Sequence, residues 1–80
     1  MQIQGDIIVN LDSFKTAKIM YEALNPEVKS APSYRSKSSI FLEKSKIIIT
    51  VNANDLTSFR AAVNSYLRLI HVISEVLSLT

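Results

Sequence analysis

The first residues of the chain alternate between apolar and polar side chains, the pattern of a β-strand with one buried side. Within residues 2–9, Ile3, Ile7 and Val9 fall on the apolar side. Gly5 falls on the same side, where the missing side chain suggests a bulge or a close approach of another group. The pattern therefore predicts a half-buried strand over residues 2–9.

A helical pattern follows, with Asp12 or Ser13 as the candidate N-cap. We expect the helix to end near Leu24, because a residue that precedes proline disfavours helical backbone, and the next two residues are Asn-Pro. Residues 27–33 are then expected to form a loop. The apolar stripe of this helix consists of Phe14, Ala17, Tyr21 and Leu24, widened by Ile19, Met20 and Ala23.

Two more strand-like segments, residues 34–43 and 46–53, are joined around Lys44 and Ser45. The hairpin pairing is the same for a two-residue and a four-residue loop. It sets Leu42 against Ile47, Ile40 against Ile49 and Phe41 against Ile48. Lysine and serine rarely adopt positive φ, so we expect the longer loop.

The chain closes with a long helical segment, residues 55–79, which contains no glycine or proline. Asn54 is the candidate N-cap, and Asp55 lies in the first turn, where a carboxylate is favourable. The predicted core stripe is Leu56, Phe59, Val63, Tyr66, Leu67, Ile70, Ile73 and Leu77. The solvated stripe is Arg60, Asn64, Arg68, His71, Glu75 and Ser78. A third row begins with Ser58, Ala62 and Ser65 and becomes apolar at Leu69, Val72, Val76 and Leu79.

The order strand, helix, strand, strand, helix predicts an α+β fold in a single domain of residues 1–80, a β-α-β-β-α arrangement. Segment 46–53 is the most continuously apolar, which favours it as the central strand of a three-stranded antiparallel sheet. Both helices can then be packed on one face. The other face carries Ile8, Phe41 and Ile48, and no helix remains to cover them.

The chain has more apolar helical surface than a small domain can hide. A chain of 80 residues buries only about 60–65% of the surface that its unfolded form exposes. We therefore expect the third row of the closing helix to be a docking surface for helices of another protein. Its residues, with two from the first helix, are Met20, Ala23, Leu69, Val72, Val76 and Leu79. The alternative is that these side chains pack on one another within the monomer.

The composition argues against an enzyme and against a bound cofactor. The chain has no cysteine, one histidine and one glycine, so zinc sites, thiol nucleophiles and phosphate-binding glycine loops are not expected. His71 lies on the solvated stripe, and the carboxylates are scattered over caps and turns. The N-terminus has no secretory pattern, and the longest apolar stretch, residues 66–80, is interrupted by charges. We expect a cytoplasmic protein without membrane contact.

Basic residues gather on or near the hairpin, although the formal net charge is only +2. They are Arg35, Lys37, Lys44 and Lys46. Such charges discourage edge-to-edge aggregation of an exposed strand, and they equally suit contact with phosphate. Both interpretations stay open, with Arg35 and Lys37 as the candidate RNA contacts.

The segment IIITVNANDLTSFRAAVNSYLRLIHVISEVL closely resembles the signature of the small Pcc-type subunit of the KEOPS complex, which is related to the CTAG family. The matching positions are Ala53, Asp55, Phe59, Arg60, Ala61, Ala62, Asn64 and Ser65. The order of elements, the helix ending in Asn-Pro-Glu and the arginine in PSYRSKSSI also match, so the resemblance spans the chain. A departure is the turn Glu43-Lys44-Ser45-Lys46, where the family often has glycine.

The resemblance implies a non-catalytic subunit with defined partners. Such a subunit dimerises, and its two helices bind the N-terminal helices of the threonylcarbamoyl transferase subunit of the complex. The complex adds threonylcarbamoyl to adenosine in tRNA, which the small subunit would contact indirectly or weakly. In this chain the uncovered face with Ile8, Phe41 and Ile48 would serve the homodimer.

Two other functions remain open from the sequence. A KH-like domain that binds nucleic acid on its own, as a regulator for example, would share the size and the mixed fold. The Gly-x-x-Gly loop of KH domains is missing, however. A paralogue that occupies the same helices but prevents dimerisation would have the same sequence features as a true dimerisation subunit.

Overall fold

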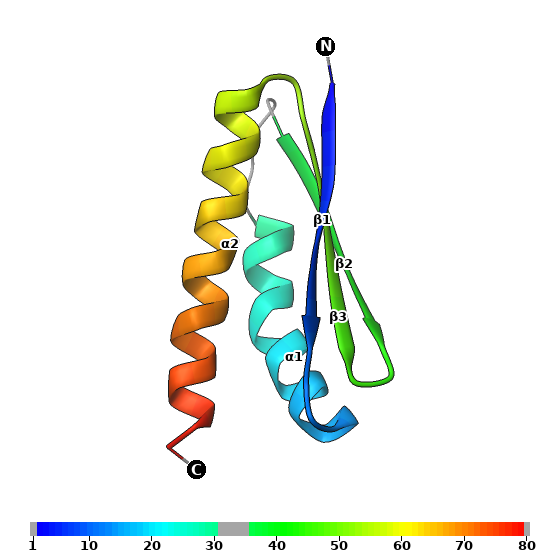
Figure 1. Cartoon of the computed structure of the whole chain (residues 1–80), viewed down its shortest axis with the longest axis vertical. Helices are drawn as coiled ribbons and strands as arrows, with labels where there is room; N and C mark the ends of the chain where they lie inside the picture. The colour runs from blue at the N-terminus through cyan, green and yellow to red at the C-terminus, as the bar shows by residue number, and fades with distance from the viewer. Residues whose placement is uncertain (1, 31–35, 80) are drawn as a thin grey trace.

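The computed structural model describes residues 2–30 and 36–79. It contains strand β1 (Ile3–Asn10), helix α1 (Phe14–Ser30), strands β2 (Ser36–Glu43) and β3 (Lys46–Ala53), and helix α2 (Leu56–Leu77). The expected β-α-β-β-α order and α+β class are confirmed (Figure 1).

The three strands form one antiparallel sheet with β3 in the centre, as expected from its apolar sequence. The register also confirms the three hairpin pairs expected between β2 and β3. The inner face of β3 lies between two strands and beneath the helices, so its side chains are the most buried of the sheet. Ile47, Ile49, Val51 and Ala53 are each 1% exposed or less.

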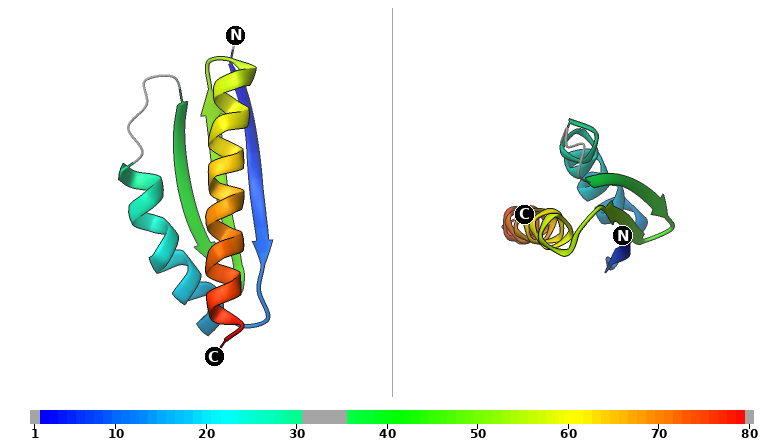
Figure 2. Two further views of the ribbon diagram at one scale, coloured as in Figure 1. Left: turned by 90° about the vertical axis from the view of Figure 1, so that its left-hand side faces the viewer. Right: turned by 90° about the horizontal axis from the view of Figure 1, so that it is seen from above.

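Both helices lie on the same side of the sheet, as the amphipathic patterns require (Figure 2). α1 packs mainly on β2, and α2 packs mainly on β3. The core between the layers joins Met20, Leu24 and Val28 of α1 with Tyr66 of α2 and the inner side chains of β3. Neither of the two helices covers the opposite side of the sheet (Figure 2).

α1 does not end near Leu24, so this prediction is wrong. The helix continues to Ser30 with Pro26 inside it, and residues 27–30 are helical rather than loop. Proline removes the hydrogen bond to the carbonyl of Glu22, but that residue is exposed, so water can replace the lost donor. The extra turns bury Val28 to 6% exposure, which offsets the cost of the proline. The rest of the expected loop, residues 31–33, lies outside the described residues.

Some residues of the two expected core stripes are exposed. Phe14 and Ile19 of α1 are 55% and 46% exposed, and Leu56 and Leu67 of α2 are each 48% exposed. In α2 the buried side is rotated toward α1 and includes Ala62 and Leu69, which pack against the core. The side-by-side position of the helices causes this rotation, and it could not be predicted from either helix alone.

The N-cap of α1 is one of the two expected residues, whereas the expected N-cap of α2, Asn54, is wrong. The Thr16 N–H donates to Ser13 Oγ at 3.1 Å, which identifies Ser13 as the cap of α1. For α2 the cap is Asp55 rather than Asn54: the Ser58 N–H donates to Asp55 Oδ1 at 2.8 Å. Asp55 has extended backbone angles, so its side chain can reach the third residue of the helix.

The hairpin turn has two residues, so the expected four-residue loop is wrong. Lys44 adopts the left-handed region with φ of 56°, which costs about 1 kcal/mol for a residue with a side chain. The turn is held from outside, because the Leu11 N–H donates to the Ser45 carbonyl at 2.8 Å. This contact comes from a distant part of the chain, and local turn preferences do not include it.

Gly5 allows a close approach between β1 and α2, as its place in the sequence suggested. A Cβ atom there would lie 2.8 Å from Cζ of Phe59. The pairing of β1 with β3 is one-to-one throughout, so the alternative of a bulge is not observed. The aromatic ring therefore packs directly on the strand backbone.

Candidate protein-binding surfaces

The side of α2 next to α1 carries an exposed apolar row, which we call the α2 row: Leu69, Val72, Val76 and Leu79. Val72 and Val76 are 56% and 58% exposed, and Leu79 is 86% exposed. Leu69 is half-buried and packs against the core. The row thus becomes progressively more exposed toward the C-terminus of the helix.

The contribution of α1 to this surface differs from the expectation. Met20 is fully buried in the core, so it does not belong to the exposed surface, and packing within the monomer accounts for it. The same packing accounts in part for Leu69. Ala23 is exposed as expected. Ile19, one turn earlier on the same side of the helix, is also exposed, and its spacing of four from Ala23 is the signal that could have identified it.

An open groove of about 400 Å³ lies between α1 and α2. Its lining residues come from both helices and are Glu27, Ser65, Tyr66, Arg68, Leu69 and Val72. A second hollow, of about 560 Å³, lies on the outer side of α2 and is lined by Asn64, Leu67, Arg68, His71 and Val72. Arg68 and Val72 line both and separate them. Sequence reasoning missed Glu27 because the proline before it predicted a loop.

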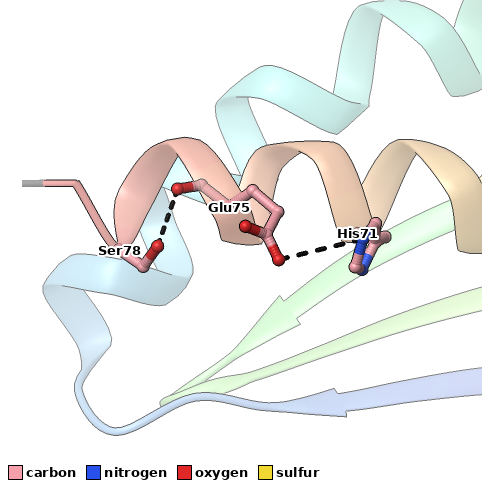
Figure 3. Close-up of polar contacts among 3 residues, drawn as sticks. All are labelled: His71, Glu75 and Ser78. Atoms are coloured by element: carbon pink, nitrogen blue, oxygen red, sulfur yellow. Dashed lines mark hydrogen bonds and ion pairs between the residues drawn. The ribbon is translucent and has the colours of Figure 1, made fainter.

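The outer side of α2 ends in a short polar series (Figure 3). His71 Nε2 lies 3.8 Å from Glu75 Oε1, one helical turn away, and Ser78 Oγ donates to the Glu75 carbonyl at 2.7 Å. The His71 and Glu75 side chains are 74% and 70% exposed, so solvent screens their interaction. Within residues 2–30 and 36–79, no group of three histidine or acidic side chains could hold a metal ion.

The open side of the sheet carries an apolar row, which we call the sheet row: Ile8, Ile48 and Phe41. The register pairs Ile8 with Ile48 and Ile48 with Phe41, so the row crosses all three strands. Ile8 and Phe41 are 55% and 57% exposed. The adjacent cross-strand sets are polar: Asp6, Thr50 and Ser39 on one side, and Asn10, Lys46 and Glu43 on the other.

The basic residues of the hairpin do not form one patch. Lys37 lies near the start of β2, opposite Asn52, whereas Lys44 and Lys46 lie at the turn at the other end. Arg35 lies outside the described residues. The fold therefore separates charges that are close in the sequence.

Taken together, these features define a small α+β domain with apolar rows on both its helical and its sheet side. No helix in the described part of the chain is long and apolar enough to cross a membrane. A family described as "Transcription factor Pcc1" matches residues 4–78. The chain therefore belongs to the Pcc1 family, which confirms the resemblance found in the closing segment.

One similar protein supports this assignment, and one solved structure shares the fold. The chain is 35% identical over 78 residues to the KEOPS complex subunit Pcc1 of Pyrococcus abyssi, a match that covers 98% of this chain and 95% of the relative. A chain in the crystal structure of a binary Gon7–Pcc1 complex has a TM-score of 0.86, with 96% of this chain and 94% of that chain covered. At 17% identity, the second match shows the shared fold alone.

Proposed function

We propose that this protein is a non-catalytic accessory subunit of a KEOPS complex and supports threonylcarbamoyl modification of tRNA in the cytoplasm. Residues 1–80 would act as one docking and dimerisation domain. Membership of the Pcc1 family and the KEOPS relative support this role. The observation that carries it is the α2 row, which is exposed beside a second helix.

The helical side is the proposed site for the transferase subunit of the complex. Its members are Ala23 of α1 and the α2 row. An amphipathic helix laid along two neighbouring helices buries apolar residues at spacings of three and four. Burying the exposed parts of Val72, Val76 and Leu79 would contribute several kcal/mol at about 25 cal/mol per Å². That amount is a large fraction of the stability of a small domain.

The sheet row is the proposed surface for a second copy of the chain. Ile8, Ile48 and Phe41 lie side by side across the strands, so two copies can stack their open faces across a two-fold axis. The helices lie on the other side of the sheet (Figure 2). A second copy and a transferase subunit could therefore bind at the same time.

Mass measurement by light scattering of the purified chain, alone and with the transferase subunit, tests both parts of the proposal. We expect a dimer alone and a larger complex when the transferase subunit is added. A monomer that does not change mass with the transferase subunit would refute the proposal. Tight binding of tRNA by the chain alone, with a steep loss as salt is raised, would instead favour the KH-like function.

A further inference from the structure

The groove between α1 and α2 carries opposite charges on its two walls. Glu27 stands on the α1 wall and Arg68 on the α2 wall, and both side chains are exposed. Tyr66, Leu69 and Val72 also line the groove and make it largely apolar. Within the described part of the chain, neither Glu27 nor Arg68 forms an ion pair. Two exposed charges of opposite sign, without ion-pair partners among the described residues, thus border a groove that is open to a ligand.

We propose that this groove selects a helix of the transferase subunit by the arrangement of its charges. The fitting helix places an apolar side chain on Leu69 and Val72, a basic side chain beside Glu27 and an acidic side chain beside Arg68. The inference rests on the proposed function, because it names the chemistry of the partner at the helical surface. The charges of the groove would determine which helix of the transferase subunit binds and in which direction it lies.

The direction follows from the positions of the two charges. A helix that enters the groove in the opposite sense would bring its acidic residue to Glu27 and its basic residue to Arg68. Like charges that face each other across an interface are strongly unfavourable and exclude partners with the wrong arrangement of charges. The apolar side chains of the groove therefore provide the contact area, and Glu27 and Arg68 determine the direction in which a helix binds.

Exchanging the two charges is the sharpest test. The double variant Glu27→Arg/Arg68→Glu keeps the net charge and the apolar floor but reverses the polarity of the groove. We expect it to bind the transferase subunit at least about tenfold more weakly than the unaltered chain. The matched control is Lys18→Glu/Glu22→Lys, which exchanges two exposed charges on the outer side of α1 and should bind like the unaltered chain.

Binding is measured by isothermal titration with the purified transferase subunit, after circular dichroism has shown that each variant is folded. Equal affinity of the exchanged variant and the unaltered chain would overturn the inference and leave the proposed function intact. Equal weakening by the control would overturn it too, because the position of the charges would then not matter. Absence of binding by the unaltered chain would refute the proposed function and the groove inference together.

Discussion

Replacing Val76 by aspartate tests the helical docking surface with little effect on the fold. Val76 is 58% exposed, and complete burial of a valine side chain is worth about 1.5–3 kcal/mol. Docking can therefore gain about 1–2 kcal/mol at this position. An aspartate loses that gain and adds roughly 1–3 kcal/mol for burying a polar group without a partner. The sum, about 3 kcal/mol, corresponds to about a hundredfold weaker binding.

Isothermal titration of the transferase subunit into the folded variant measures this loss. Ser74→Asp is the matched control, since Ser74 is exposed on the same helix, outside the α2 row, and receives the same charge near the same helix end. We expect the control to bind within about threefold of the unaltered chain. If Val76→Asp also binds within threefold, the α2 row is not the docking surface. Leu69→Asp would be a poorer choice, because Leu69 also packs against the core.

Three further changes test other parts of the structure. Phe41→Glu places a charge in the sheet row, and we expect a monomer by light scattering; an unchanged dimer mass would show that self-association uses another surface. Gly5→Ala brings a Cβ to 2.8 Å from the Phe59 ring, so thermal melting should show a loss of about 1 kcal/mol, and equal stability would mean that the ring moves freely. Asn25→Ala removes a buried oxygen that has no donor among the described residues and adds a better helix former, so we expect a gain of about 1 kcal/mol, which a lower melting temperature would contradict.

The sheet could be predicted almost completely from the sequence. The first strand alternates with a period of two, and the pairing of Ile40 with Ile49 is the same for either loop length, so the sequence defined the register and the residues of the buried face. The turn could not be predicted, because the contact between Leu11 and Ser45 joins segments far apart in the chain. Turn preferences describe the cost of positive φ at Lys44, but they do not include a hydrogen bond from a distant segment.

The helices were harder to predict in detail. Both have apolar residues over more than one side, so the pattern alone left the position of the buried side open. The structure buries Met20 and Val28 and exposes Phe14 and Leu67, and the packing of each helix on the sheet and on the other helix decides which side is covered. The proline rule describes the local cost, whereas the burial of Val28 by the extra turns is a long-range contribution that partly offsets this cost. Only the three-dimensional arrangement could place Glu27 opposite Arg68 across a groove.

α2 buries little of its surface, which affects how easily it separates from the sheet. Of its residues Leu56–Leu77, Tyr66 alone is buried, and the others of the packed side are only partly covered. A long helix held by so little enclosed area should separate from the sheet at a lower free energy than the strands separate from one another, and its amide hydrogens should exchange with solvent first. Any ligand that covers it would slow this exchange, so part of the affinity would be spent on ordering the last turns of the chain.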